Sequence, residues 1–482
     1  MRVADFPSNT KSQDAGRYHP QSEIDMSNLH DTICALSTAP GRAGIAVVRL
    51  SGPESFPLVR KIFIADGPEG EPAARRVTLG TIVEPGSGGS LDRALVTRFP
   101  APGSYTGEDV AEISLHGSPV LVAALLEHLC SMGARLAEPG EFTMRAFLNG
   151  RMDLAQAEAV HDVIQATTLY QAQVAARQRA GQISRELGPI EKALMDVIVQ
   201  LEAAVEFVEE DLTLDSRAAL AGKMESISGG MRQWIDSFRR GRIVRDGFSM
   251  AIVGKPNVGK SSLFNALLRQ DRSIVTEMPG TTRDLVSEFT SLEGIPVRLL
   301  DTAGVRASGD KVEQLGVDRS LQAIADADTI LFVVDVSLKP DGEDEDLRRR
   351  LQGLSCIVVL NKCDLAGRWT DSEKNLFAGE WPRLEASAKT GAHIDLLQKE
   401  ILDHLFGAQR DGILVTNLRH CRCLESAEEH LRRAASALHE GISEEFVLVD
   451  LHAGLQELGA ITGKTSTEEL LGEIFSRFCI GK

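Results

Sequence analysis

The stretch "FSMAIVGKPNVGKSSLFNALL", residues 248–268, decides the fold of the segment around it. It contains the phosphate-loop pattern G-x-x-x-x-G-K-S/T from Gly254 to Ser261, between a strand-like run and a helix-like run. Glycines in such a loop let backbone N–H groups approach phosphates, and the following helix N-terminus favours negative charge. Lys260 can neutralise the outer phosphates and Ser261 can coordinate Mg²⁺. The other expected contacts are Asn257, Val258, Gly259 and Ser262. A plain glycine-rich turn is the alternative.

Three later motifs favour GTP over ATP. "DTAG" begins with Asp301, which ends a strand and can hold Mg²⁺ through water, while the Gly304 N–H can reach the last phosphate. "NKCD" ends in Asp364, whose carboxylate can accept two hydrogen bonds from guanine, and in "SAK" a backbone N–H can meet guanine O6. The residues expected at the nucleotide are Asp301, Thr302, Ala303, Gly304, Asn361, Lys362, Asp364, Ser387, Ala388 and Lys389.

The water-positioning residue of GTP hydrolysis is missing from its usual place. In Ras-type GTPases a glutamine follows the glycine of this loop, whereas here Val305 follows Gly304 and can make no side-chain hydrogen bond. If the protein hydrolyses GTP, another residue must hold the attacking water. Between the first two motifs lies "GTTRD", residues 280–284, where a threonine can complete the Mg²⁺ shell; a polar loop is the alternative.

The periodicity of apolar residues changes along the chain, and this change predicts a multidomain α+β and α/β protein. We expect a disordered tail at 1–27, in which Met26 is an alternative start, and an α+β domain at 28–148. A helical region at 149–246 precedes an α/β domain with a parallel sheet at 247–406, and helical periodicity returns at 407–482. There "STEELLGEIFSRF" starts with the capping-box pattern of Ser466 and Glu469. The α/β domain is therefore interpreted as an insertion into one discontinuous helical domain; two unrelated helical regions are the alternative.

Composition limits the classes of function. The 482-residue chain is 43% hydrophobic and 25% charged, as in ordinary globular proteins. No apolar run approaches the ~20 residues of a membrane span. The seven cysteines are scattered, which indicates reduced thiols and a cytoplasmic setting. The net charge of −17 argues against a nucleic-acid binder, so any RNA contact must be local or shared with a partner.

From about residue 28 onward the sequence resembles the MnmE (TrmE) family of tRNA uridine-modifying GTPases. The stretches that carry the resemblance are "APGRAGIAVVRLSG" at 39–52, "SYTGEDVAEI" at 104–113, "PGEFTMRAFLNGRMDLAQAEAV" at 139–160, the "GTTRD" loop and the terminal "FCIGK". The resemblance implies an N-terminal domain like tetrahydrofolate-binding domains, a discontinuous helical domain and an inserted Ras-like P-loop G domain.

The resemblance also implies the reaction and the partners. It implies a homodimer joined through the N-terminal domain, which acts on tRNA with the flavin-dependent subunit MnmG (GidA) in a heterotetramer, away from membranes. The two proteins would add an aminomethyl or carboxymethylaminomethyl group at C5 of the wobble uridine. The one-carbon unit would come from a folate, either 5-formyltetrahydrofolate or methylenetetrahydrofolate.

For GTP hydrolysis, the resemblance implies roles for an acid and a potassium ion. Glu313 of "DKVEQLG" matches the family's glutamate that positions the attacking water, which answers the question raised by Val305. A K⁺ ion takes the place of an arginine finger, and Thr282 falls at the Mg²⁺ position. The matching K⁺ ligands are Asn257, Thr276, Met278 (through its backbone carbonyl) and Thr281.

The folate contacts of the family match Arg49, Glu112, Arg151 and the terminal Lys482. A glutamate suits the donor edge of a pterin, and basic side chains suit carboxylate or formyl oxygens. Cys479 of "FCIGK" would lie near this pocket and take part in the modification, whereas a packed or frayed thiol is the alternative. One departure is that Arg306 is followed by Ala307, where family members often carry an acidic residue.

Two other classes of function fit parts of the sequence. One is a signalling or ribosome-assembly GTPase whose outer domains only recruit partners, and the other is a folate enzyme with a regulatory G domain. The folate-like motifs and the terminal cysteine argue against a pure switch, which needs neither.

Overall fold

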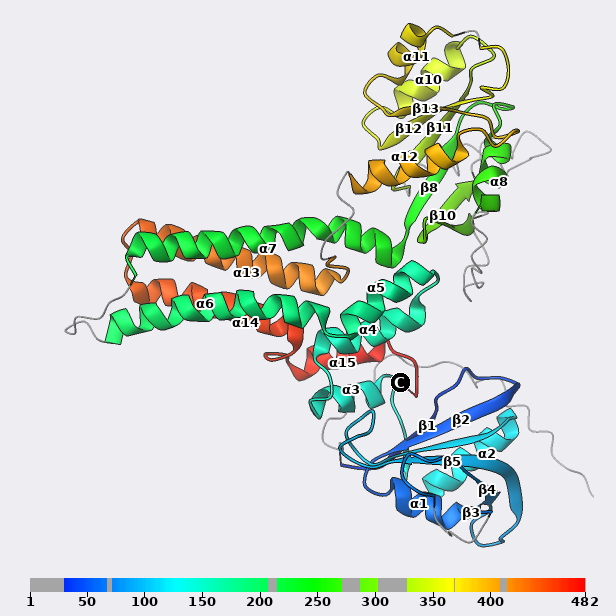
Figure 1. Ribbon diagram of the computed structural model, residues 1–482, viewed down its shortest axis with the longest axis vertical. Coiled ribbons are helices and arrows are strands. Elements are labelled where there is room, and N and C mark those ends of the chain that lie inside the picture. The colour runs from blue at the N-terminus through cyan, green and yellow to red at the C-terminus, as the bar shows by residue number, and fades with distance from the viewer. Residues whose placement is uncertain are drawn as a thin grey trace, which may run out of the picture. The chain divides into compact units, whose positions relative to one another are not determined.

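The computed structural model describes residues 30–66, 72–206, 215–270, 287–301, 327–367, 369–407 and 414–481. They belong to two compact units, one of Met1–Asp153 with Ser466–Lys482 and the other of Leu154–Thr465 (Figure 1). Within the described ranges, no helix is both long enough and apolar enough to cross a bilayer.

The first unit is built on a seven-stranded sheet in the order β3-β4-β5-β6-β2-β1-β7. Neighbouring strands are antiparallel, except that β7 runs parallel to β1. The elements of this unit are β1 (Ile33–Leu36), β2 (Ala43–Ser51), α1 (Ser55–Ile62), β3 (Phe63–Ala65), β4 (Thr78–Val83), β5 (Ser90–Phe99), β6 (Val110–Gly117), α2 (Pro119–Ser131), β7 (Arg135–Leu136), α3 (Glu141–Leu148) and α15 (Glu468–Ser476). The α+β character predicted for residues 28–148 is confirmed, with β2, β5 and β6 in the sheet and α2 as a long helix.

The last helix departs from the domain division expected from sequence. Residues 466–482 pack with the N-terminal unit, whereas the sequence pattern grouped them with the second helical region. The reason is that α15 packs on α3 and buries Leu471 and Phe475 there. Its N-cap is Thr467, whose hydroxyl accepts the N–H of Leu470, so the cap lies one residue after the predicted Ser466.

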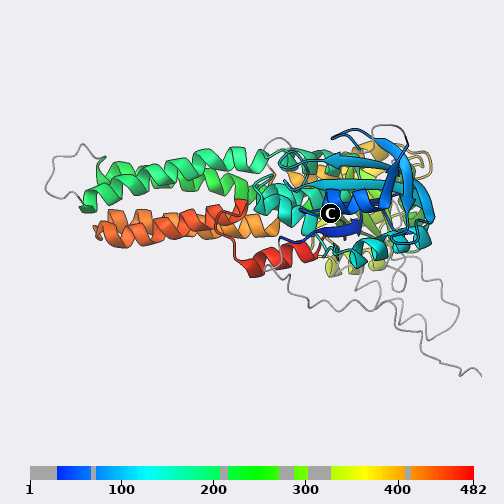
Figure 2. The same ribbon diagram turned by 90° about the horizontal axis from the view of Figure 1, so that it is seen from below.

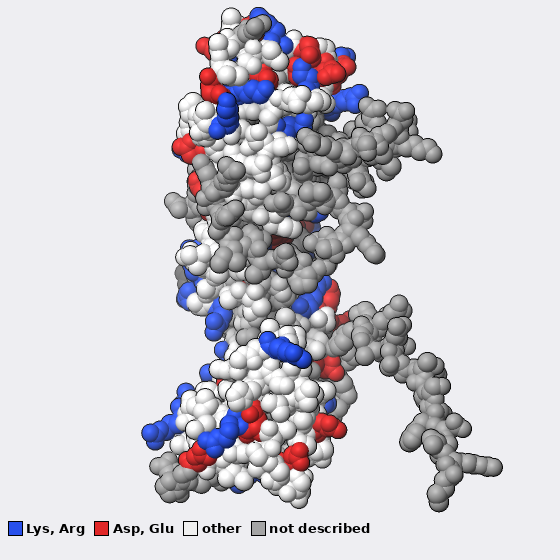
Figure 3. All heavy atoms as spheres, turned by 90° about the vertical axis from the view of Figure 1, so that its right-hand side faces the viewer, with Lys and Arg blue, Asp and Glu red and all other residues white. Residues whose placement is uncertain are grey.

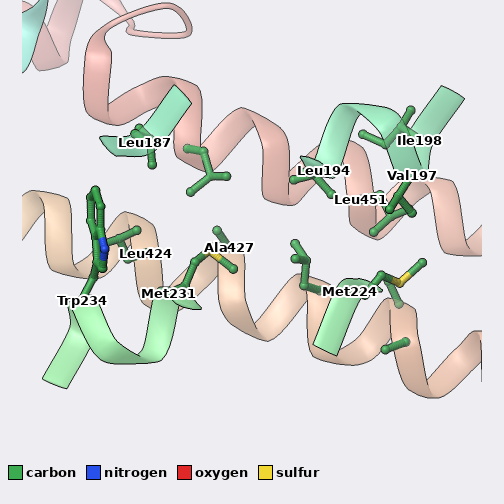
Figure 4. Packing of buried hydrophobic residues seen from close by; sticks show 14 of the residues in the cluster. Leu187, Leu194, Val197, Ile198, Met224, Met231, Trp234, Leu424, Ala427 and Leu451 are labelled. Atoms are coloured by element: carbon green, nitrogen blue, oxygen red, sulfur yellow. The ribbon is translucent and has the colours of Figure 1, made fainter. Parts of the chain in front are cut away.

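Four long helices of the second unit form an antiparallel bundle (Figures 1 and 2). They are α6 (Gln182–Glu206), α7 (Arg217–Asp246), α13 (Leu418–His439) and α14 (Glu444–Thr462), and the shorter α4 (Leu154–Gln165) and α5 (Leu169–Arg179) precede them. Leu194, Met231 and Leu424 come from three different helices and belong to one buried cluster that fills the bundle core (Figure 4). Two segments separated by the α/β domain therefore share one core, as predicted for a discontinuous helical domain.

The α/β part of this unit has a six-stranded sheet in the order β13-β12-β11-β8-β10-β9. Its elements are β8 (Phe248–Val253), α8 (Lys260–Gln270), β9 (Ser287–Leu292), β10 (Ile295–Asp301), β11 (Thr329–Asp335), α10 (Gly342–Arg350), β12 (Cys356–Asn361), α11 (Asp371–Ala378), β13 (Arg383–Ala386) and α12 (Ile394–Phe406). All residues of β11 and β12 are buried, as expected for central strands covered on both faces.

The sheet is parallel except at one edge. β9 runs antiparallel to β10, which the sequence analysis did not predict. The turn between them consists of Glu293 and Gly294, with φ values of 48° and 83°. Positive φ at both central positions is the geometry of a tight hairpin, so the chain reverses here without a crossover helix.

Candidate functional site

The phosphate loop lies between β8 and α8, as predicted. An added Cβ at Gly254 would lie 2.3 Å from the carbonyl oxygen of Val333, and one at Gly259 would lie 2.2 Å from Nδ2 of Asn361. Gly259 also has φ of 102°, which disfavours other residues. The loop is thus seated directly on the ends of β11 and β12, with no room for a side chain at either glycine.

Two lysines, Lys260 and Lys255, stabilise the phosphate loop. The Lys260 ammonium donates to the carbonyl oxygens of Gly254 and Lys255, at 2.8 and 2.7 Å. The Lys255 ammonium forms ion pairs of 2.7 Å with both Asp341 and Asp344 at the start of α10. Lys260 thus closes the phosphate loop on its own carbonyl oxygens, whereas Lys255 anchors the loop to α10.

Asn257 stands at the rim of the loop. It has a φ of 65° and is exposed, beside a cavity of about 320 Å³ that it lines together with Asp335 and Lys362. Its amide makes no hydrogen bond within the part of the chain that the structure describes. An amide oxygen in this position is suited to a cation held against the nucleotide.

Asn361 connects the motifs of the nucleotide site. Its Nδ2 donates to the carbonyl oxygen of Val258 at 2.7 Å, and its Oδ1 accepts the N–H of Ala388 at 3.0 Å. The side chain is almost fully buried, so both bonds are shielded from water. The sequence analysis placed Asn361 at the nucleotide; the geometry shows that it fixes the phosphate loop and the "SAK" loop to one strand end.

The residues predicted to recognise the base are oriented by short side-chain contacts. The Ser387 hydroxyl donates to Oδ1 of Asp364 at 2.6 Å. Lys362 forms a 2.6 Å ion pair with Asp335, a residue that the sequence analysis did not select. Burial opposes ionisation of Asp335, but the hydrogen bonds from Lys362 and Ser337 outweigh it and hold its pKa below the usual value. Asp364 and Lys362 thus lie on one fixed loop after β12.

The other residues predicted to bind the nucleotide lie at a strand end, in the first turn of a helix, in a loop, or outside the described ranges. Asp301 is the last residue of β10, paired with Ile252 of β8, as predicted for a strand-end acid. Ser261 and Ser262 lie in the first turn of α8, and Lys389 is exposed in the loop after β13. The residues outside the described ranges are Thr276, Met278, Thr281, Thr282, Thr302, Ala303, Gly304, Arg306 and Glu313, and the terminal Lys482 also lies outside them.

The N-terminal unit brings two of the predicted folate residues together. Arg49 of β2 and Glu112 of β6 are directly opposite across the strand pair. The Nε and NH2 of Arg49 both donate to Oε1 of Glu112, at 3.0 and 2.8 Å. Glu112 Oε2 has no partner among the described residues, so one acceptor of this carboxylate is available to a ligand.

Two aromatic rings hold Arg49 in place. Its guanidinium carbon lies 5.6 Å from the centre of the Tyr105 ring and 5.7 Å from that of Phe142. Its NH1 also donates to the Gly481 carbonyl oxygen, at 3.4 Å. Arg151 is exposed, with side-chain carbons near Gly107, and no hydrogen bond joins it to Arg49 or Glu112 in the described ranges. Sequence reasoning did not select Tyr105, Phe142 or Gly481, because their role depends on contacts between distant segments.

A buried ionic cluster holds α3, the helix that carries the Phe142 ring beside Arg49. Arg145 of α3 is only 1% exposed and forms ion pairs with Asp31, Glu141 and Glu108, at 2.6, 2.9 and 3.3 Å. Burial lowers the tendency of Arg145 to ionise, but these carboxylates outweigh it and raise its pKa. The cluster fixes α3 to the strand-end loops, and α3 carries the Phe142 ring that flanks Arg49.

The parallel sheet, the phosphate loop and the ordered Asp364 and Ser387 loops define the chain as a multidomain P-loop GTPase. Residues 154–479 match the sequence model of the "MnmE helical domain", and residues 32–151 match that of the "GTP-binding protein TrmE N-terminus". The chain belongs to the MnmE (TrmE) family.

Similar proteins span nearly the same length. The tRNA modification GTPase MnmE of Koribacter versatilis is 44% identical over 459 residues, which cover 94% of this chain and 100% of that protein. The protein of the same name from Moorella thermoacetica is 42% identical over 465 residues, with the same coverage of each chain. Among solved structures, Aquifex aeolicus Era bound to GDP·AlF4⁻ is 31% identical, with a TM-score of 0.28, and covers 38% of this chain and 66% of that one.

Proposed function

We propose that this chain hydrolyses GTP in a potassium-dependent manner to drive the modification of tRNA at C5 of the wobble uridine. The group added is aminomethyl or carboxymethylaminomethyl, its one-carbon unit comes from a tetrahydrofolate, and a flavin-dependent subunit of the MnmG (GidA) type acts with the chain. Family membership over both outer regions supports this proposal.

The observation that carries the proposal is the Arg49–Glu112 pair. A pterin has a donor edge, and the open Oε2 of Glu112 is the kind of acceptor that edge requires. The remaining NH groups of Arg49 can donate to a carbonyl or carboxylate of the same ligand. The flanking rings of Tyr105 and Phe142 keep water from one side of the guanidinium, which strengthens such bonds.

The residues of the α/β part fit GTP with Mg²⁺ and K⁺. Asp364 accepts from the donors of guanine, and the Lys260 ammonium leaves the loop carbonyls to meet phosphate oxygens. The cations supply positive charge against the phosphates when bound. Asn257 offers its exposed amide oxygen to K⁺, with Thr276, Met278 and Thr281; Ser261 and Thr282 serve Mg²⁺; and Glu313 positions the attacking water.

Surface features support the proposed partners. Leu79 of β4 and Leu95 of β5 are directly opposite on neighbouring strands and are 47% and 40% exposed, which favours a homodimer through the N-terminal unit. Acidic and basic side chains are interspersed on the face shown in Figure 3. With a net charge of −17, the chain is therefore proposed to share the tRNA contact with the flavin-dependent subunit.

The experiment is a nucleoside analysis of bulk tRNA from the source organism lacking this protein. We expect the modified wobble uridines to disappear and to return when the wild-type chain is supplied. Supplying Arg49→Ala should leave them absent while the purified variant still hydrolyses GTP. A regulatory or ribosome-assembly GTPase would instead leave the wobble uridines normal in all strains.

A further inference from the structure

The C-terminal segment after α15 is held on the N-terminal unit at two points, both of them glycine contacts. Gly140, at the start of α3, donates its N–H to the carbonyl oxygen of Cys479 over 3.4 Å. A Cβ at Gly140 would lie 2.6 Å from the carbonyl oxygen of Phe475. Phe475 is fully buried and its ring lies 5.4 Å from that of Phe478. The first contact therefore fixes the backbone at Cys479 itself and at Phe475, four residues earlier.

The second contact follows the thiol. Gly481 is buried and has φ of 90°, and a Cβ there would lie 2.3 Å from the carbonyl oxygen of Leu36 and 3.0 Å from Cα of Ser37. Its own carbonyl oxygen accepts from the Ser37 hydroxyl at 3.1 Å and from Arg49 NH1 at 3.4 Å. Both the conformation and the close approach require glycine.

Cys479 makes the first of these contacts through its carbonyl oxygen, and Ile480 lies between the two; both side chains are exposed, Ile480 to 50%. Neither side chain is buried in a pocket that could hold it. The position of the Cys479 thiol is therefore decided by the backbone, which is fixed on one side at Gly140 and on the other at Gly481. The second contact also uses Arg49, so the backbone two residues after Cys479 is hydrogen-bonded to the guanidinium that pairs with Glu112.

We propose that Gly481 is a positioning residue for Cys479, a role that rests on the proposed function of the thiol in tRNA modification. Glycine at 481 lets the backbone there lie against the end of β1, which places the thiol at a constant distance from Arg49. Reactions that require close alignment lose about a hundredfold in rate for a displacement of 1 Å. A substituent at 481 displaces the segment and so acts on the reaction without touching the thiol.

The test compares Gly481→Ala with Gly472→Ala in the purified full chain. Gly472 lies in α15, an added Cβ there meets nothing within 4 Å, and it touches none of the site residues. The first readout is the rate at which carboxypeptidase Y trims the C-terminus, followed by intact mass. We expect Gly481→Ala to be trimmed at least about tenfold faster than Gly472→Ala, since proteolysis follows local opening.

The second readout is wobble modification with the flavin-dependent subunit, measured beside GTP turnover. We expect Gly481→Ala to lose modification by about ten- to a hundredfold, with GTP turnover unchanged. Ser37→Ala removes one hydrogen bond to Gly481 and should shift both readouts in the same direction by less. Lys482→Ala keeps the Gly481 contacts, so the trimming of this variant should stay slow. This control separates loss of the lysine charge from displacement of the thiol.

Equal trimming and equal modification in the two glycine variants would overturn the proposal. Faster trimming with full modification would also overturn it, because the anchor would exist without positioning a functional group. Failure of the proposed function is recognised separately: full modification by Cys479→Ser would show that the thiol has no role, whatever the trimming rates are.

Discussion

The side-chain amide of Asn361 donates a 2.7 Å hydrogen bond to the carbonyl oxygen of Val258 and so joins the end of β12, where the "NKCD" motif begins, to the phosphate loop. Its other end accepts from the N–H of Ala388. One buried side chain therefore fixes three separate motifs relative to one another. Removing it leaves a buried N–H and a buried carbonyl without partners, which is more costly than losing an exposed bond.

Asn361→Ala should weaken the binding of GTP and GDP alike. Unsatisfied buried groups cost about 1–3 kcal/mol, so we expect a loss of roughly 5- to 150-fold in affinity, measured with fluorescent nucleotides. Asn375→Ala is the matched control, because Asn375 accepts from Arg383 on the exposed side of α11. Unchanged affinity in Asn361→Ala would mean that the loops keep their positions without this bridge.

Asp364→Asn should weaken GTP binding and admit xanthine nucleotides. The carboxylate accepts from two guanine donors, whereas an amide can donate to the extra carbonyl of xanthine. Ser387 still orients the side chain, because its hydroxyl can donate to an amide oxygen as it does to Asp364. Competition between GTP and XTP measures the change, and a retained preference for GTP would place base recognition elsewhere.

GTP turnover should require K⁺ and should lose that requirement in Asn257→Ala. No glutamine follows Gly304, and Asn257 is exposed at the rim of the phosphate loop. We expect turnover to be at least about tenfold faster in K⁺ than in Na⁺ at equal ionic strength, because a cation against the phosphates stabilises the charge that develops there. Rb⁺ should substitute in part. Equal rates in K⁺ and Na⁺ for the wild-type chain would contradict a potassium site.

Glu313→Ala should slow hydrolysis by roughly 10²–10⁴-fold, the usual scale for losing a positioned acid–base group. Nucleotide affinity should barely change, because the residue is expected to contact water and not GTP. Glu380→Ala, at an exposed position in the same domain, should hydrolyse normally. A parallel fall in affinity and rate would assign Glu313 a structural role.

Glu158→Ala should destabilise the helical bundle. Glu158 is buried, accepts from Arg419 at 2.8 Å and lies 2.6 Å from Nε2 of His420, so its removal leaves the Arg419 guanidinium and the buried His420 ring without this partner. Breaking such a buried pair costs about 3–5 kcal/mol. Hydrogen exchange of α13 peptides measures the loss, and Glu429→Ala is the control, since Glu429 pairs with Arg432 on the surface of α13.

The stabilising effect of Glu158 should decrease as the pH falls. Burial opposes its ionisation, but His420 and Arg419 outweigh burial and hold its pKa below the ordinary 4.5. A lowered pKa contributes stability that is complete above the unfolded value and is lost as pH falls through the folded value. The difference in stability between the wild-type chain and Glu158→Ala should therefore be constant above about pH 5 and become smaller below about pH 4. A gap that widens in acid would contradict the ion pair.

Local pattern predicted the strand and the helix that flank the phosphate loop. The run of 248–268 predicts a strand, a phosphate loop and a helix because each is coded within a few residues: apolar strand, glycines without side chains, then a helix N-terminus. The same reasoning predicts Asp301 and Asp364, because Asp301 ends an apolar strand, Asp364 lies three residues after the end of another, and the carboxyl ends of parallel strands meet at one edge. The hairpin that makes β9 antiparallel is also encoded locally, because it depends on the two turn residues Glu293 and Gly294. This pair could have indicated the hairpin from the sequence.

Tertiary structure alone decided which distant segments meet. The apolar stripe of α15 predicts that one face is buried but is equally compatible with any apolar partner, so the sequence could not place residues 466–482 on α3. The pairing of Arg49 with Gly481 joins positions 432 residues apart, and that of Asn361 with Val258 joins positions 103 apart. Such contacts form only after the chain has buried its cores, because shape and hydrogen-bond satisfaction over the whole unit select them, and no local pattern encodes that selection.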